Sequence, residues 1–272
     1  MHDHAMTSTD PVAAWILPAL VLLVPAAAYL VLALRWSARR GQRWSSLRTA
    51  SWLLGLVLVA AALAPPLSDA ARHDPMAHMA QHLLIGMYGP LALVLAAPVT
   101  LFLGATTTQT ARRLSWLLRT PVVQTLSHPA VATLLSAGGL WVLYATPLFE
   151  ATMSSALVHH LVLLHLVASG CLFTWAVAGP DPAPRRPGML VRLAALLVSA
   201  ASHALLAKTL YARAGEWPPG AHGSVERLEE AAQLMYYGGD VAEILLAVVL
   251  FAWWYSRTAP RPRPVAARPQ EV

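Results

Sequence analysis

Seven apolar runs, each about as long as a bilayer is thick, dominate this sequence. A helix needs roughly 20 apolar residues to cross the hydrocarbon core, at about 1.5 Å of rise per residue. Only 12% of the 272 residues are charged, whereas soluble domains carry roughly 25%. The sequence therefore predicts an all-α integral membrane protein, a single seven-helix bundle over residues 1–272. The predicted spans are residues 12–34, 48–66, 76–98, 128–146, 156–178, 189–211 and 233–255.

The basic residues predict the orientation of this bundle. Most of the 19 Lys and Arg residues follow spans one, three, five and seven. Loops on the cytoplasmic side of a membrane are enriched in such residues, which predicts an external N-terminus and a cytoplasmic C-terminus with a disordered tail over residues 257–272. The basic residues do not form a soluble module with interleaved aromatic residues, so we expect the lipid bilayer as a partner and no nucleic acid. The single cysteine, Cys171, excludes an internal disulfide and any Cys-pair metal motif.

The third apolar run carries two histidines close to its external end. His78 and His82 are four residues apart, so a helix places both imidazoles on one face. Met76 and Met79 lie beside them. Polar side chains inside a bilayer are costly and usually face a partner or a water-filled cavity. We therefore expect other spans to bring matching groups to the same depth.

Three further spans carry ionisable groups at a similar depth. Span five contains His159, His160 and His165, which point in three directions at about 100° per residue. His165 lies deepest, and we expect either His159 or His160 to join it while the other meets water. The groups on spans six and seven are His203, Asp240 and Glu243. At about 1.5 Å of rise per residue, these groups and His82 lie about 9–15 Å from the external ends, which predicts one polar layer in the outer leaflet.

The donor types in this layer favour a transition metal. Imidazole suits copper, zinc or iron, and thioether sulfur selects Cu(I). The predicted ligands are His78, His82, His165, His203, Asp240 and Glu243, with Met76, Met79, His159 and His160 as further candidates. The carboxylates either bind the metal, orient the histidines from outside the coordination shell, or accept the protons that metal binding displaces. The alternative is an interhelical hydrogen-bond network without metal.

Three motifs around this layer resemble a known family. They are the His-rich third span, the W-x-x-x-G-P-D-P exit from span five that begins at Trp175, and the Gly-Gly-Asp start of span seven at Gly238. Over residues 50–256 the chain resembles the multi-span CtaG-type (caa3-type) cytochrome c oxidase assembly factors. The resemblance implies a seven-span protein of the bacterial plasma (inner) membrane that assists copper insertion into the haem-copper centre. Many members carry an Asp-Gln pair where this chain has Asp240 and Val241, which leaves the client oxidase open.

We therefore interpret the chain as a membrane copper-binding assembly factor and not as a catalyst. Its site opens to the external, periplasmic side, where copper enters past Met76 and Met79. Its expected partner is a cytochrome c oxidase subunit or a copper chaperone. One alternative is a membrane redox protein or enzyme with a His-ligated haem or metal centre, and another is a structural or proton-relay subunit without metal. Analysis of the purified protein for copper, zinc and haem distinguishes these three.

Overall fold

The computed structural model describes residues 12–183, 185–221 and 223–258, and these form helices without any named β-strand. The prediction of an all-helical membrane protein is confirmed. Six helices are long and apolar enough to cross a bilayer, and a seventh crossing follows if the pair Pro129–Ala145 and Leu148–Ser154, bent by 75°, is one span. The predicted tail lies outside the described residues from residue 259 onward.

The third and fourth membrane segments are interrupted, whereas the helices before and after them are continuous. The continuous membrane-length helices are α1 (Ile16–Arg40), α2 (Ser46–Leu63), α12 (Ala156–Ala178), α13 (Met189–Ala212) and α14 (Val225–Thr258). The third segment comprises α4 (Pro75–Leu83), a π-helical turn (Leu84–Tyr88), α5 (Gly89–Leu95) and α6 (Pro98–Ala105). The fourth comprises α9 (Pro129–Thr133), a second π-helical turn (Leu134–Gly138) and α10 (Gly139–Ala145). The short elements are the 3-10 turn Ala13–Trp15, α3 (Pro65–Ala70), α7 (Thr108–Leu118), α8 (Pro121–Leu126) and α11 (Leu148–Ser154).

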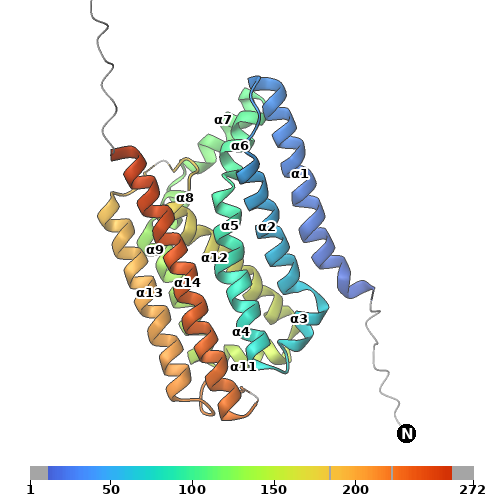
Figure 1. Cartoon of the computed structure of the whole chain (residues 1–272), viewed down its shortest axis with the longest axis vertical. Helices are drawn as coiled ribbons and strands as arrows, with labels where there is room; N and C mark the ends of the chain where they lie inside the picture. The colour runs from blue at the N-terminus through green and yellow to red at the C-terminus, as the bar shows by residue number, and fades with distance from the viewer. Residues whose placement is uncertain (1–11, 184, 222, 259–272) are drawn as a thin grey trace, which may run out of the picture.

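The helices form a bundle with α1 at one edge and the pair α13–α14 at the other (Figure 1). Helix α5 packs against both α2 and α12 in the middle, and α4 packs against α14. The described chain begins and ends at opposite ends of the bundle (Figure 1). The seven predicted spans would give this placement, because an odd number of crossings puts the two ends of a chain on opposite sides of a membrane.

The third segment is interrupted by the π-helical turn Leu84–Tyr88. Pro90, the second residue of α5, has no backbone N–H to donate to the carbonyl oxygen of Gly86, so the regular α-helical hydrogen bond is missing there. Helix α12 crosses this turn at close range, because a Cβ atom on Gly170 would overlap the carbonyl oxygen of Gly86. Such π-turns occur often at functional sites, and here the turn lies directly below His82.

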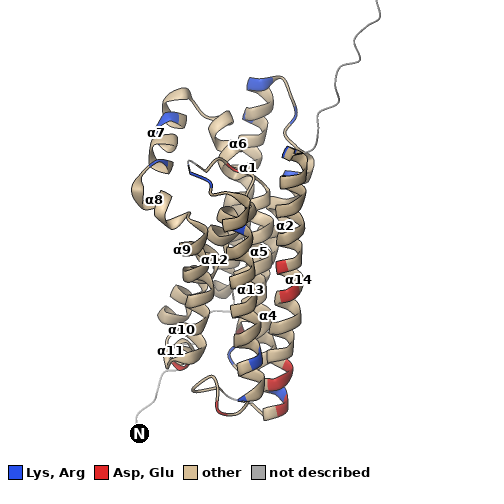
Figure 2. Cartoon of the chain, turned by 90° about the vertical axis from the view of Figure 1, so that its left-hand side faces the viewer, with Lys and Arg blue, Asp and Glu red and all other residues tan. Residues whose placement is uncertain are grey.

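Lys and Arg predominate at one end of the bundle, around the end of α1, α7 and the end of α14 (Figure 2). We call this end the basic end. At this end Asp181, from the Pro-Asp-Pro exit of α12, is 3% exposed and caps α6. Its carboxylate accepts hydrogen bonds from the amides of Val99 (3.1 Å) and Thr100 (2.7 Å) and from the Thr100 hydroxyl (2.6 Å). This motif therefore ties the end of α12 to the end of the third segment.

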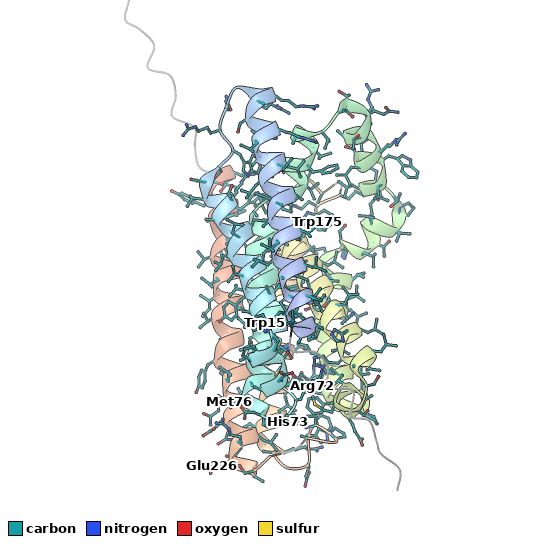
Figure 3. The ribbon with its side chains drawn as sticks, turned by 90° about the vertical axis from the view of Figure 1, so that its right-hand side faces the viewer. Trp15, Arg72, His73, Met76, Trp175 and Glu226 are labelled. Carbon is teal, nitrogen blue, oxygen red and sulfur yellow. The ribbon has the colours of Figure 1, made fainter. Side chains whose placement is uncertain are left out.

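The opposite end carries Arg72, His73, Met76 and Glu226 (Figure 3), and we call it the His73 end. Most of the described acidic residues lie here or midway along α14 (Figure 2). By the enrichment of basic residues in cytoplasmic loops, the charge distribution predicts that the basic end faces the cytoplasm.

Candidate metal-binding site

Helix α4 carries the first residues of the candidate site. Asp74 caps this helix, since its carboxylate accepts a hydrogen bond from the amide of Ala77 at 3.2 Å. The same carboxylate pairs with Arg227 of α14 at 3.1 Å. The start of α4 is therefore held against α14, and His78 and His82, one turn apart on the same face, point into the bundle.

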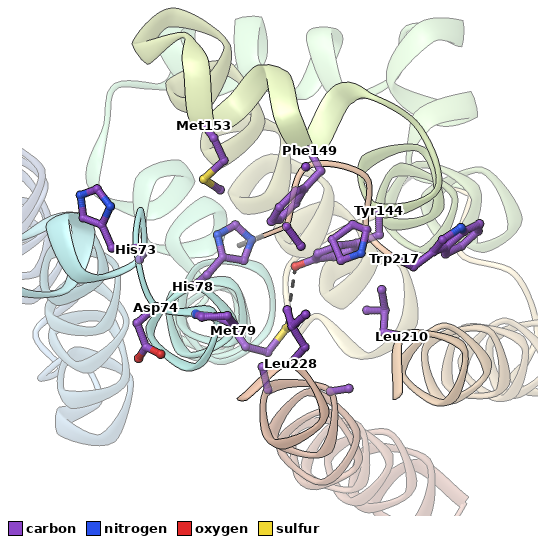
Figure 4. Close-up of a pocket in the computed structure, with 17 residues that line it drawn as sticks. His73, Asp74, His78, Met79, Tyr144, Phe149, Met153, Leu210, Trp217 and Leu228 are labelled. Atoms are coloured by element: carbon purple, nitrogen blue, oxygen red, sulfur yellow. Dashed lines mark hydrogen bonds between the residues drawn. The ribbon is translucent and has the colours of Figure 1, made fainter. Parts of the chain in front are cut away.

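Tyr144 of α10 lies against both imidazoles. Its ring centroid is 6.2 Å from that of His78 and 6.2 Å from that of His82, and the rings are nearly perpendicular. Phe149 of α11 contacts His78 in the same edge-on manner at 5.1 Å. The Tyr144 hydroxyl reaches the sulfur of Met79 at 3.8 Å (Figure 4). The aromatic rings of Tyr144 and Phe149 therefore cover one side of the two histidines.

A cavity of about 50 Å³ lies beside His78, and we call it the outer cavity (Figure 4). Two thioethers, from Met79 and Met153, line it together with the His78 ring. His73 and Asp74 also line it, and His73 is exposed at the end of the bundle. A water molecule needs roughly 10–15 Å³, so the outer cavity has room for a few waters or for an ion with part of its shell.

Two further cavities lead from the outer cavity toward the middle of the bundle. His78 and His82 both line a small cavity of about 10 Å³, which Gln81, Thr152 and His159 also contact. His82 in turn lines a third cavity of about 50 Å³, which we call the inner cavity. The two histidines of α4 thus connect all three cavities into one row.

The inner cavity joins α4 to α12, α13 and α14. His203 of α13 stacks beside His82 with ring centroids 6.3 Å apart and 25° between the planes. Glu243 of α14 lines the same cavity and is 9% exposed. A Cβ atom on Gly239 would overlap the His203 ring, so a glycine is needed where α14 passes this histidine. Hydroxyl groups complete the wall, from Ser136, Ser169, Thr174 and Ser199.

Four buried ring nitrogens along this row have no hydrogen-bond partner among the described residues: His78 Nδ1, both nitrogens of His82, and His203 Nε2. Buried polar atoms in proteins are nearly always hydrogen-bonded to protein or to ordered water. Since a neutral imidazole carries one donor and one acceptor, each of these rings can still bind water or offer a lone pair to a metal. The row therefore fits a soft or borderline cation by its donor chemistry.

The structure separates His165 and His160 from this row. His165 is exposed on the outer face of α12, where its Nε2 lies 3.1 Å from the carbonyl oxygen of Leu135. His160 is also exposed, and its Nδ1 lies 2.6 Å from the carbonyl oxygen of Ala156. Of the three histidines of α12, His159 is the buried one that reaches the row. This differs from the expectation that His165 would point inward.

The remaining predicted residues lie at the margin of the row. Met76 is half-buried against the core near the outer cavity without lining it, and Asp240 is half-buried on α14 without lining the inner cavity. Within the described ranges, no three His, Cys, Asp or Glu side chains are grouped closely enough to hold one ion. The polar groups line a series of small cavities, whereas the sequence predicted that they form a single cluster.

Several residues of the site were not predicted from the sequence. Met153 lies on a short helix after the bent fourth segment, and Tyr144 and Gln81 carry no motif of their own. The amide of Gln81 donates to the carbonyl oxygen of Ala62 at 2.7 Å, which holds α4 against α2. For Gln81, the one sign in the sequence that it belongs to the site is its polarity, because it is a polar residue in an apolar run, as Ser136 is.

A comparison with protein families identifies the family to which this chain belongs. Residues 27–257 match the model of the cytochrome c oxidase caa3 assembly factors (Caa3_CtaG), a match that begins within α1 and includes every residue of the row. The chain belongs to this family. The resemblance seen in the histidine and Gly-Pro-Asp-Pro motifs is therefore confirmed.

Relatives of this chain occur in mycobacteria. The chain is 33% identical over 173 residues to an uncharacterised protein of Mycobacterium leprae, a match covering 61% of this chain and 26% of the relative. It is 34% identical over 187 residues to uncharacterised proteins of Mycobacterium bovis and Mycobacterium tuberculosis, covering 63% of this chain and 28% of each relative. The chain thus spans only about a quarter of the length of these relatives. No solved structure matches the chain.

Proposed function

We propose that this assembly factor binds copper as cargo at the outer cavity and passes it along the row of imidazoles to a cytochrome c oxidase subunit or a copper chaperone. The observation that carries the proposal is the set of four buried ring nitrogens that have no hydrogen-bond partner among the described residues, beside the sulfur of Met79. Imidazole is a good copper ligand, and thioether sulfur selects Cu(I). Membership of an oxidase assembly family supports copper over other ions, since the haem-copper oxidases require it.

Each residue of the row has a proposed role. The His73 end faces outside the plasma membrane, and copper reaches His78 between the thioethers of Met79 and Met153. His82 and His203 bind it further in, with Met76 and His159 as further candidate ligands. Among the described residues that line the inner cavity Glu243 is the only carboxylate, and it either binds the metal or orients the imidazoles. Asp240, His160 and His165 have no role in this scheme.

The copper content of the purified protein tests the proposal. We expect wild-type protein from copper-supplied cells to retain copper, and the double variant His78→Ala/His82→Ala to lose most of it. The matched control is His160→Ala/His165→Ala, which removes the same number of imidazoles from α12 outside the row. Mass spectrometry of the metal and the absorption spectrum are measured on the same samples.

Three results would contradict copper binding at this row. They are wild-type protein without copper, equal copper loss in both double variants, and a Soret band or zinc in place of copper. A Soret band would assign the site to haem and a redox role. Protein free of every metal would favour a proton relay or a structural subunit.

A further inference from the structure

Three guanidinium groups surround one tryptophan at the basic end. Trp253 of α14 has the guanidinium carbon of Arg192 4.3 Å from its ring centroid, that of Arg257 at 4.9 Å and that of Arg186 at 5.8 Å. Arg192 comes from α13, Arg257 from α14, and Arg186 from the loop after α12. We call this group the arginine cluster.

No carboxylate neutralises the arginine cluster within the described residues. The described salt bridges both involve Arg227, at the opposite end of the bundle. Asp181 is the nearby acid, but its carboxylate already accepts three hydrogen bonds at the start of α6. Arg186 reaches only the main-chain carbonyl oxygen of Asp181, at 2.7 Å. Three positive charges therefore lie close together, and none of them forms a salt bridge to a carboxylate of the described residues.

Arg192 has an unused hydrogen-bond donor in the arginine cluster. Arg192 is only 1% exposed, and its Nε donates a hydrogen bond to the carbonyl oxygen of Val177 at 2.5 Å. One terminal nitrogen has no partner among the described residues. A buried charge without a partner is strongly unfavourable. Burial lowers the pKa of Arg186, and the positive charge of Arg257 lowers it further, while Asp181 raises it. The net lowering is expected where positive charges are poorly compensated.

We propose that the arginine cluster binds the phosphate of an anionic phospholipid headgroup in the leaflet at the basic end. Guanidinium groups bind phosphate through paired, charge-assisted hydrogen bonds, and basic pockets between membrane helices are known to hold acidic headgroups. Exposed apolar side chains lie within one turn of the cluster on the same two helices, where acyl chains would pack: Leu190, Phe251 and Trp254. The lipid would bridge α13 and α14.

Lipid retention by the full-length protein in detergent tests this site. We measure the binding of phosphatidylglycerol, phosphatidylcholine and inorganic phosphate by native mass spectrometry. The double variant Arg186→Gln/Arg257→Gln avoids the buried Arg192. We expect it to weaken phosphatidylglycerol binding by about fivefold for each arginine removed, from the roughly 1 kcal/mol that a basic residue contributes near an anionic membrane surface. Arg192→Gln tests the buried member in parallel.

The matched control is Arg112→Gln/Arg113→Gln, which removes two exposed charges from α7 at the same end. We expect this control to retain phosphatidylglycerol as wild type does, and phosphatidylcholine to bind weakly throughout. Equal losses in both double variants, or equal retention of the two lipids, would overturn the proposal. Inorganic phosphate that displaces phosphatidylglycerol at equal concentration would show a free-phosphate site instead. Copper content is expected to stay unchanged in every variant, so this test is independent of the proposed function.

Discussion

At the scale of single residues, the direction of a side chain decides whether it belongs to the site. Depth along a helix follows from the sequence, and it predicted His165 at the level of Glu243, in the same layer as His203. Six residues separate His165 from His159, which is about 240° around an α-helix at about 100° per residue. The two rings therefore face different sides of α12, and only His159 is buried. Sequence alone gives no fixed reference for which side faces the bundle.

Gly239 is a residue whose replacement tests the packing of the inner cavity. A Cβ atom there would overlap the His203 ring, so we expect Gly239→Ala to lower the free energy of unfolding. Overpacking lowers the free energy of unfolding by about 1–3 kcal/mol, while the better helix propensity of alanine raises it by about 1 kcal/mol. Thermal unfolding in detergent, followed by tryptophan fluorescence, measures the difference.

The control for this variant is Gly188→Ala, at a position where no atom lies within 4 Å of an added Cβ. Gly188 is the N-cap of α13, where alanine is less favourable than glycine, so we expect only a small loss of stability there. A gain in stability for Gly239→Ala would mean that helix propensity outweighs the contact, and that His203 moves freely in its cavity.

At the scale of elements, the helices follow from the apolar runs because a bilayer leaves backbone groups no partner except one another. The ends of the helices were harder to predict. Helix α14 begins at Val225, before the run predicted from residue 233, since its first turns carry Glu226, Glu229 and Glu230 outside the apolar part. The π-helical turns Leu84–Tyr88 and Leu134–Gly138 depend on packing against α12 and were not predictable from local sequence.

The start of α4 allows the contributions of a helix cap and an ion pair to be separated. Asp74→Ala removes both the cap of α4 and the contact with Arg227. We expect it to cost about 1 kcal/mol of stability through the lost cap. Asp74→Asn keeps a capping side chain and loses only the charge, so we expect a smaller effect. Denaturation in detergent at low and high salt measures both.

Equal costs for the two Asp74 variants would show that the ion pair, not the cap, holds α4 in place. That cost would then fall with added salt, because exposed ion pairs are screened. A cost carried by the cap would not depend on salt.

At the scale of the whole molecule, the site is distributed over the bundle. Residues from α4, α10, α12, α13 and α14 line cavities that meet at His78 and His82. The sequence predicted that several spans bring polar groups to one region, because each such group is costly in lipid on its own. It did not predict a row of cavities, since the register between helices depends on contacts such as Gly170 against Gly86.

The orientation of the whole bundle is testable because the chain has a single cysteine. In a Cys171→Ala background, we place one new cysteine at each end of the described chain and one in a surface position at each end of the bundle. These variants are Val12→Cys, His73→Cys, Arg113→Cys and Arg257→Cys. A membrane-impermeant maleimide is then applied to intact spheroplasts and to permeabilised ones.

We expect Val12→Cys and His73→Cys to react in intact spheroplasts, and Arg113→Cys and Arg257→Cys to react only after permeabilisation. The physical reason is the arginine-rich basic end, which should stay in the cytoplasm, together with an odd number of crossings between Val12 and Arg257. If Val12→Cys and Arg257→Cys reacted from the same side, the bent segment of α9–α10 and α11 would not cross the membrane. If all four responses were reversed, the row of histidines would open to the cytoplasm, and copper would have to come from inside the cell.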